Sequence, residues 1–457
     1  MTRAALHIND AGITILDTGR IHYRQPGFAL LDDETLTTGH DAFARARINP
    51  RHVQHRYWSD LTTEALRDTR FRHLSPADLV SRQLEQAWQA VPADIDELVV
   101  AVPGFLSSEH LGLFLGIARD LTLPVVALAD AAVAATRREY RNAVPVHIDM
   151  GLHATTMTRI AQDGHARVER TEVLENCGIY ALNDAWLTAV AEAFVRQSRF
   201  DPLHTADTEQ LLLDQLGAWL AQAGRDEQVE LELQSGGVAH RAEIEPLALI
   251  GAAAPWYQQI ANRLRALIRA DEIAAIQLTD RVSRLPGLAD MLTARVGGEI
   301  YALEAGATAR GALARCRNDG RGNQEAVKLL RQLPWDQAAV TIEADPAGAR
   351  TGGVPTHLLF GHVAWRIEEA PLTVGTQAEE RDRRIPLDGE MPGVSRRHCV
   401  VRRANGQCIV EDYSRYGTFL NGHRIDGSTV LQVGDSLRVG SPGFEFLLIT
   451  TDETHGA

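Results

Sequence analysis

The chain has 457 residues, a length that suits about three domains of ordinary size or two large ones. Hydrophobic residues make up 45% and charged residues 23%, so the composition is that of a folded globular protein and excludes disorder as the main state. The formal net charge of -14 argues against a broad nucleic-acid-binding surface, and the apolar runs are too short for a membrane span. We therefore expect neither a nucleic-acid partner nor a membrane partner.

The first part of the chain mixes strand and helix patterns. A hairpin is predicted over residues 6–17, with its turn at Asp10 to Gly12, and a second strand-turn-strand unit over 144–161, with its turn at Met150 and Gly151. Further strands are predicted at 95–105, at 123–130 and at 273–280, and a hairpin at 229–244. Helices are predicted at 111–121, 130–140, 179–220, 260–270 and 285–296.

The pattern changes at about Arg317. Polar, Gly-containing and Pro-containing stretches follow, and they predict a linker over residues 317–356. From His357 short alternating runs are separated by Asp-Gly, Pro-Gly and Asn-Gly pairs, which is typical of a β-sandwich. The expected organisation is a mixed α/β domain over 1–316, the linker, and an all-β domain over 357–452.

The four cysteines do not form a Cys-x-x-Cys pair, so the sequence predicts neither a zinc site nor a redox motif. No structural disulfide is expected either, and residues 1–10 lack the apolar core of a secretory signal. These features predict a cytoplasmic protein.

The most specific motifs lie between Leu372 and Leu448, in four pieces. They are Gly375, the run Ser395-Arg396-Arg397-His398, the segment from Asp412 to Gly422, and Val433-Gly434-Asp435. In this order the pieces resemble the forkhead-associated (FHA) domain, a β-sandwich that binds phosphothreonine peptides. The resemblance implies a threonine-phosphorylated protein as the partner.

The residue types at these positions suit a phosphate. Ser395 offers a hydroxyl, and Arg396 and Arg415 offer forked, permanently charged groups. The candidate phosphopeptide-binding residues are Ser395, Arg396, Arg415, Tyr416 and Asn421. The resemblance also implies that His398 braces the loops from within and that Asp412 caps a turn. Asn421 has two open roles, contacting the peptide or holding the shape of its own loop.

One departure from the family concerns charge. Members usually carry an arginine after the glycine that corresponds to Gly375, and that arginine contacts the phosphate, whereas this chain has Thr376. Arg381, Arg383 or Arg384 could supply the missing charge, or they could belong to a solvated loop.

The order of the N-terminal motifs resembles the nucleotide-binding domain shared by DnaK-type chaperones and actin, over residues 6–314. The motifs are the turn at Asp10 to Gly12, the segment 38–50, the strand ending in Val102-Pro103, the Ala-rich run 128–135, the turn at Asp149 to Gly151, and the segment 276–292. The resemblance implies a two-lobed α/β fold. It also implies Asp10, Gly12, Asp149 and Gly151 as candidate nucleotide-binding residues and ATP or ADP with Mg²⁺ as the possible cofactor; ordinary turn roles for the two aspartates remain an alternative.

Three departures weaken the case for ATP hydrolysis. The second phosphate turn continues with Leu152 and His153 where the family has further glycines, and Asp280-Arg281 replaces a glycine pair at the adenosine loop. Phosphoryl transfer in this family uses a lysine at the γ-phosphate, but Lys328 is the only lysine and lies in the expected linker. The sequence thus predicts no metal site and no catalytic residues.

The favoured hypothesis is a cytoplasmic adaptor or signalling protein. In it the FHA domain recruits a threonine-phosphorylated partner to a degenerate DnaK/actin-like scaffold or nucleotide sensor, a pseudo-ATPase. The alternative is an ATP-dependent chaperone-like or motor ATPase that its FHA domain targets. A filament-forming protein, as among actin relatives, is a third class on which the sequence gives no information.

Overall fold

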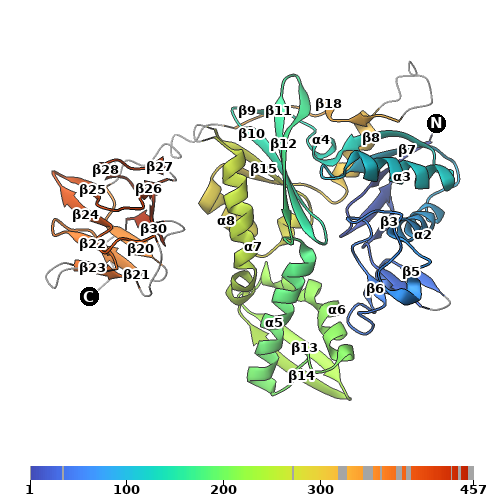
Figure 1. Ribbon diagram of the computed structural model, residues 1–457, viewed down its shortest axis with the longest axis horizontal. Helices are drawn as coiled ribbons and strands as arrows, with labels where there is room; N and C mark the ends of the chain where they lie inside the picture. The colour runs from blue at the N-terminus through green and yellow to red at the C-terminus, as the bar shows by residue number, and fades with distance from the viewer. Residues whose placement is uncertain are drawn as a thin grey trace. The chain divides into compact units, whose positions relative to one another are not determined.

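The computed structural model describes most of the chain. The described residues are 2–32, 35–269, 272–316, 327–342, 354–360, 363–376, 383–387, 393–421, 423–433, 435–440 and 444–450. They divide into two compact units, an N-terminal unit up to residue 343 and a C-terminal unit from residue 344 (Figure 1). Each unit is described by itself.

The first lobe of the N-terminal unit is built on a six-stranded sheet in the order β17-β8-β7-β1-β2-β3. Its strands are β1 (Thr2–His7), β2 (Ile13–Leu16), β3 (Ile21–Gln25), β7 (Ile95–Val102), β8 (Val125–Asp130) and β17 (Leu329–Leu330). Strands β1, β2 and β3 are antiparallel neighbours, whereas β1, β7, β8 and β17 run parallel. The hairpin predicted around Asp10 to Gly12 is therefore present.

Helices cover both faces of this sheet (Figure 1). Along β7, Leu98 and Val100 pack against α2 (Pro76–Gln89) and α3 (Ser108–Asp120). The alternate residues, Val99 and Ala101, belong to the core formed with α4 (Ala131–Ala135) and α9 (Ala307–Arg315). This two-sided burial explains why the run reads as continuously apolar. The Ala-rich helix is shorter than predicted, because α4 ends at Ala135.

Smaller elements complete the first lobe. A three-stranded sheet is formed by β4 (Ala29–Leu31), β5 (Leu36–Thr38) and β6 (Val53–Gln54). The short helix α1 (His40–Phe43) follows β5, and the 3-10 helix η1 (Thr69–Phe71) precedes α2.

Five strands of the second lobe's sheet repeat the order of five in the first, and β18 is added at its antiparallel edge. Its sheet is ordered β16-β15-β10-β11-β12-β18, with β10, β11 and β12 antiparallel and with β15 and β16 parallel to β10. The strands are β10 (Val144–Met150), β11 (Ala154–Gln162), β12 (His165–Glu175), β15 (Ala274–Leu278), β16 (Glu299–Ala302) and β18 (Gln332–Pro334). In both lobes a tight turn joins the central strand to its antiparallel neighbour.

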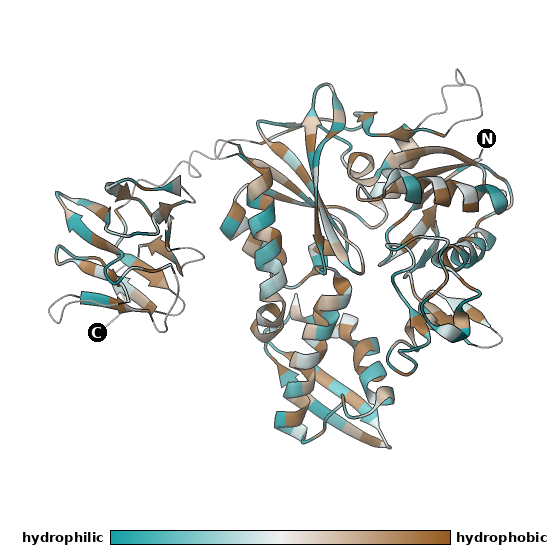
Figure 2. Cartoon of the chain, viewed as in Figure 1, coloured by the Kyte–Doolittle hydropathy of each residue, from teal (hydrophilic) through white to brown (hydrophobic). Residues whose placement is uncertain are grey.

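Helices and a hairpin extend the second lobe away from its sheet (Figure 1). They are α5 (Ile179–Ser198), α6 (Ala206–Ala223), α7 (Pro246–Leu267), the 3-10 helix η2 (Val282–Arg284) and α8 (Leu288–Val296), with the hairpin β13 (Val229–Ser235) and β14 (Val238–Ile244). Figure 2 shows hydrophobic and hydrophilic residues alternating along the hairpin, whose inward residues on β13 join the core of α5 to α8. Gly236 and Gly237 form its turn with φ of 58° and 78°, which a two-residue turn of this kind requires.

Part of the expected linker belongs to the N-terminal unit. Within residues 327–342, β17 joins the first sheet, β18 joins the second, and β19 (Val340–Thr341) pairs with β9 (Tyr140–Arg141). Leu333 on β18 is buried, and the Arg315 guanidinium donates to the carbonyl oxygen of Pro334 at 3.3 Å. The structure thus differs here from a linker over 317–356, because short apolar stretches add edge strands to existing sheets.

The C-terminal unit is a β-sandwich of two sheets around one apolar core. One sheet has the order β21-β20-β30-β29-β26-β27 and the other β23-β22-β24-β25-β28. The first contains β20 (His357–Phe360), β21 (Val363–Arg366), β26 (Thr418–Leu420), β27 (His423–Arg424), β29 (Ser436–Val439) and β30 (Phe444–Ile449). The second contains β22 (Leu372–Gly375), β23 (Arg383–Pro386), β24 (Cys399–Ala404), β25 (Gln407–Asp412) and β28 (Ser428–Leu431).

Two further sequence expectations can be compared with the described residues. Cys177, Cys316, Cys399 and Cys408 are all free and buried. Within the described part of the chain, the helices are too short or too polar to cross a membrane.

Candidate functional site

The loops that carry the candidate phosphopeptide residues lie side by side at one end of a sheet. Strands β24 and β25 are antiparallel, with Cys399 opposite Asp412. Ser395 and Arg396 lie a few residues before β24, and Arg415 and Tyr416 lie a few residues after β25. The register of the two strands therefore brings these segments together, and Arg415 bonds to Ser395. The sequence alone could place these residues in loops, and the pairing of the strands shows that the loops are neighbours.

His398 holds the two loops in place, as the sequence predicted. It is fully buried, its Nδ1 accepts the Ser395 N–H at 3.0 Å, and its Nε2 lies 3.0 Å from the carbonyl oxygen of Gly417. Because a backbone N–H only donates and a carbonyl only accepts, the proton must sit on Nε2. Burial lowers the pKa of His398, which keeps the imidazole neutral in this role.

The hydroxyl of Ser395 is presented by its neighbours. Ser395 Oγ accepts the backbone N–H of Arg415 at 3.0 Å, which leaves the hydroxyl proton available for another acceptor. The side chains of Arg396, Arg415 and Tyr416 are exposed at the same end of the sandwich. This group offers one hydroxyl donor and two guanidinium groups to a ligand.

Asp412 and Gly417 shape the loop between β25 and β26. Asp412 Oδ1 accepts the Ser414 N–H at 2.9 Å and the Thr418 hydroxyl at 2.8 Å, so it caps the turn as predicted. Burial opposes its ionisation, but these hydrogen bonds hold the pKa of Asp412 below its ordinary value. Gly417 has φ of 92°, a conformation that other residues rarely adopt.

The backbone of Thr376 is hydrogen-bonded to the loop that carries Ser395. The Thr376 N–H donates to the carbonyl oxygen of Ser395 at 3.3 Å, and its side chain is exposed. A Cβ at the preceding Gly375 would lie 2.1 Å from the carbonyl oxygen of Arg396, so the close approach of the two segments requires glycine there. An arginine in place of Thr376 would extend from the edge of this site.

Of the three arginines that could supply the missing charge, Arg383 lies away from Thr376 in the structure. Strand β23 runs parallel to β22, and Arg383 lies opposite Leu372, at the other end of β22 from Thr376. Arg383 donates to the carbonyl oxygen of Arg366 and pairs with Glu368 at 2.9 Å. Arg384 is exposed opposite Thr373, and Arg381 lies outside the described residues.

Asn421 lies apart from the other candidate phosphopeptide-binding residues. It follows β26, whereas Arg415 and Tyr416 precede the same strand. Its Nδ2 donates to Asp435 Oδ1 at 2.7 Å, and its Oδ1 accepts the Ser436 N–H at 2.9 Å. With φ of 50°, Asn421 holds a turn, so of its two open roles the structure supports loop shape.

Arg424 is a residue of this region that sequence reasoning missed. A Cβ at Gly417 would lie 2.9 Å from Arg424 Nε, so this exposed arginine runs against the Gly417 turn. The hairpin of β26 and β27 places it opposite Phe419. The Asn-Gly pair at 421–422 in the sequence could have predicted that Arg424 lies opposite Phe419, because such pairs favour two-residue hairpin turns.

In the N-terminal unit, the two predicted phosphate turns meet each other. Asp10 Oδ1 accepts the backbone N–H of Leu152 at 2.7 Å, and Asn9 Nδ2 donates to Asp149 Oδ2 at 2.8 Å. A Cβ at Gly151 would lie 2.4 Å from Asp10 Oδ1. The candidates Asp10, Gly12, Asp149 and Gly151 are therefore close together, but their carboxylates bond to the protein itself.

The pKa values of the two aspartates shift in opposite directions. Burial raises the pKa of Asp10 to about 6. Burial also opposes ionisation of Asp149, but His7, His147 and Arg281 together with the Asn9 hydrogen bond hold its pKa below the ordinary value. Asp149 Oδ1 accepts the Thr279 hydroxyl at 2.9 Å, so both of its oxygens have protein partners.

Arg281 occupies the space between the two turns. Its Nη1 donates to Asn9 Oδ1 at 3.2 Å and to the carbonyl oxygen of Met150 at 3.3 Å. A Cβ at Gly12 would lie 2.4 Å from Arg281 Nη2. Arg24 on β3 pairs with Asp280 at 2.7 Å and adds a second connection between the lobes. The Arg281 side chain therefore fills space between the turns that a glycine at this position would leave open.

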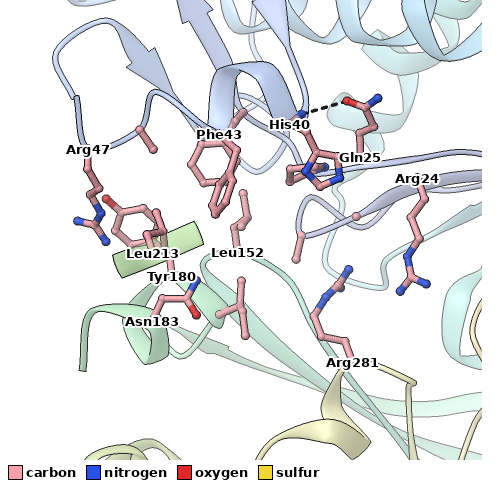
Figure 3. Close-up of a pocket in the computed structure, with 16 residues that line it drawn as sticks. Arg24, Gln25, His40, Phe43, Arg47, Leu152, Tyr180, Asn183, Leu213 and Arg281 are labelled. Carbon is pink, nitrogen blue, oxygen red and sulfur yellow. Dashed lines mark hydrogen bonds between the residues drawn. The ribbon is translucent and has the colours of Figure 1, made fainter. Parts of the chain in front are cut away.

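A cavity of about 290 Å³ opens between the lobes above Arg281 (Figure 3). Its walls are apolar at Phe28, Phe43, Leu152 and Leu213. The charged residues among its described lining are Arg24, Arg47 and Arg281, and the lining includes no Asp or Glu from the described residues. Lys328 is remote from this region, because β17 lies at the far edge of the sheet with β8 and β7 between it and β1.

Comparisons with known proteins concern the C-terminal unit. Residues 372–440 match the family model of the FHA domain. A search of curated proteins finds no match to the chain. The matched residues include Gly375, Ser395, His398 and the loop from Asp412 to Gly417, which together form the two-loop site described above. The C-terminal unit of this chain therefore contains an FHA domain at residues 372–440.

Proposed function

We propose that this protein is a cytoplasmic adaptor whose FHA domain recruits a threonine-phosphorylated partner. The observation that carries the proposal is the pair of loops fixed by His398, which presents the Ser395 hydroxyl beside Arg396 and Arg415. Hydrogen bonds from charged donors to a phosphate are stronger than neutral ones, so this combination suits a phosphate dianion. Tyr416 is exposed beside these groups, where it would contact the peptide around the phosphothreonine.

The N-terminal unit serves in this proposal as a scaffold of the actin and DnaK type. The support is the repeated sheet, in which five strands of each lobe have the same order: two parallel strands, the central strand and two antiparallel strands. A tight turn follows the central strand of each sheet, and these turns face each other between the lobes. The scaffold would connect the recruited phosphoprotein with further partners.

The residues between the lobes do not fit a nucleoside triphosphate with Mg²⁺. The oxygens of Asp149 and one oxygen of Asp10 accept protein hydrogen bonds, and the described residues contain no cluster of three or more acidic, His or Cys side chains suited to a metal. Arg281 lies against Gly12, where close backbone approach to a phosphate would be needed. We therefore propose that the N-terminal unit is a pseudo-ATPase. The alternative of an ATP-dependent chaperone-like or motor ATPase rests on the repeated sheet alone.

The proposal is tested by calorimetry on a phosphothreonine peptide selected from a library. Ser395→Ala and Arg415→Ala should each weaken binding by roughly fivefold or more, because each removes one hydrogen-bond donor worth about 1 kcal/mol or more. Thr376→Arg should tighten binding by about tenfold, because it adds a charge-assisted bond at the edge of the site.

Arg402→Ala is the matched control, since Arg402 pairs with Glu411 on the neighbouring strand, outside the two loops. If Ser395→Ala and Thr376→Arg leave binding unchanged, these loops do not bind phosphate, and the domain would be a phosphate-independent interaction module.

A further inference from the structure

The cavity between the lobes of the N-terminal unit has two unlike ends (Figure 3). Arg24 and Arg281 lie at one end, and Phe43, Leu213 and Tyr180 lie toward the other. The volume of about 290 Å³ is at the lower limit for sites that bind small organic molecules. Mostly apolar walls with a few placed polar groups are typical of such sites.

Arg281 carries a charge that the described residues leave without an ion pair. Its Nη1 is used by Asn9 and the Met150 carbonyl, whereas Nε and Nη2 make no hydrogen bond with the described part of the chain. The same two nitrogens form one edge of the planar guanidinium, the fork that matches the two oxygens of a carboxylate or sulfonate. Arg281 lines the cavity, as does Gly12, against which its Nη2 lies.

The charged side chains that line this end of the cavity, among the described residues, are Arg24 and Arg281. Arg24 is paired with Asp280, but Asp280 also pairs with Arg284 at 2.6 Å, so one carboxylate serves two arginines. Arg47 at the opposite end is paired with Asp184 and with Glu209 at 3.4 Å, so it is already neutralised. Asp149, Asp280 and Asp10 act on the charge of Arg281 from nearby, but no carboxylate of the described residues pairs directly with its guanidinium. An anionic ligand on the free edge would add that direct, charge-assisted contact.

The apolar end is lined by rings held in fixed contact. Phe28 and Phe43 meet edge to face with centroids 5.1 Å apart, and Tyr180 stacks on His55 at 4.5 Å. These contacts fix the rings before a ligand arrives, which reduces the entropy lost on binding. The body of a ligand that reaches Arg281 would lie against Phe43 and Leu152.

We propose that this cavity binds a small amphipathic organic acid, with its carboxylate or sulfonate on Arg281 and its apolar body between the aromatic walls, without a metal ion. This inference does not rest on the proposed function of the FHA domain. It follows from the same feature that argues against a nucleotide with Mg²⁺. The Arg281 guanidinium lies where a phosphate would need close backbone approach, and a guanidinium can itself bind an anion.

The test uses two fluorescent probes with the full-length chain, 8-anilinonaphthalene-1-sulfonate and N-phenyl-1-naphthylamine. They share the ring system, but the second lacks the sulfonate. The unaltered protein should bind the sulfonate at one saturable site and more tightly than the neutral probe. Arg281→Gln should weaken sulfonate binding by about tenfold or more and leave the neutral probe unchanged, because one charge-assisted pair is lost.

Matched variants control for folding and for general charge. Arg295→Gln removes an exposed arginine of α8 in the same lobe and should change neither affinity. Arg281→Lys keeps the charge and should recover part of the sulfonate affinity. Ala46→Phe should narrow the cavity and weaken both probes, which gives a second test with Arg281 intact if Arg281→Gln fails to fold.

Equal affinity for the two probes in the unaltered protein would overturn the proposal, as would full sulfonate binding in Arg281→Gln or in Ala46→Phe. Displacement of the sulfonate by ATP with Mg²⁺ would also overturn it and favour a nucleotide site. Phosphothreonine peptide binding is a separate measurement on the FHA domain, so failure of one proposal does not imply failure of the other.

Discussion

Single side chains connect separate loops in both units of this protein. His398 accepts from Ser395 and donates to Gly417, and therefore fixes two loops that are far apart in sequence. Asn9 and Asp10 do the same between the lobes, by bonding to Asp149 and to the Leu152 N–H. Each of these groups is satisfied by protein partners, so its cost of burial is largely offset.

Asp10 provides a pH-dependent test of the contact between the lobes. Its folded-state pKa is about 6 instead of 3.8, so the ionised carboxylate opposes folding above about pH 6, and this cost disappears as the pH falls toward 4. Asp10→Asn keeps an oxygen that can accept from Leu152. We expect it to raise the free energy of unfolding by about 1–3 kcal/mol at pH 8, with the gain lost near pH 4.

Denaturant unfolding at the two pH values measures this effect, and Asp17 provides a control of opposite sign. Hydrogen bonds from the Arg20 backbone and from His22 lower the pKa of Asp17 to about 2, so its carboxylate stabilises the fold above about pH 4 and that contribution is lost as the pH falls toward 2. Asp17→Asn should therefore destabilise the protein at pH 8. A loss of stability in Asp10→Asn at pH 8 would show that its carboxylate is needed in ionised form.

At the scale of single residues, the sequence was most informative where a motif fixes local spacing. The roles of His398 and Asp412 were implied by the resemblance to the FHA domain, and both side chains make the corresponding hydrogen bonds. The ion pair of Arg383 with Glu368 could not be predicted, because it depends on the parallel pairing of β22 with β23. Likewise, the guanidinium of Arg281 reaches Asn9 only when the two lobes meet.

At the scale of elements, the strands and turns around both sites could be predicted from alternation and from Gly-containing turns. The hairpins at Asp10 to Gly12 and at Gly236-Gly237 are examples. The edge strands β17, β18 and β19 could not, because two or three residues carry too little periodicity to distinguish a strand from a loop. Their pairing partners lie far away in the sequence, so only the assembled sheets identify them.

These edge strands change the expected pattern of limited proteolysis. Backbone groups that pair within sheets are protected from cleavage, so the segment 327–342 should resist a protease. We expect a stable C-terminal fragment whose first residue lies between 343 and 356, as identified by mass spectrometry. Early cleavage within 327–342 would contradict the assignment of this segment to the N-terminal unit.

At the scale of the whole molecule, the N-terminal unit combines a repeated two-lobed sheet with an arginine that lies between its two facing turns. Lys328 lies at the far edge of the first sheet, and Arg281 fills the space between the turns. We expect phosphate release from ATP with Mg²⁺ by the purified full-length chain to equal that of a buffer blank. Turnover that is lost in Asp149→Ala would show instead that the unit is an active ATPase.

The central claim is that the FHA domain recruits its partner through phosphothreonine, and binding to paired peptide libraries tests it most directly. The full-length chain is applied to an immobilised degenerate library that contains phosphothreonine and to the same library made with threonine. We predict that the chain is retained on the phosphorylated library alone. Ser395→Ala should abolish this retention, whereas Ser428→Ala, which alters an exposed serine on β28, should leave it unchanged. Equal retention on both libraries, or full retention of Ser395→Ala, would contradict the account.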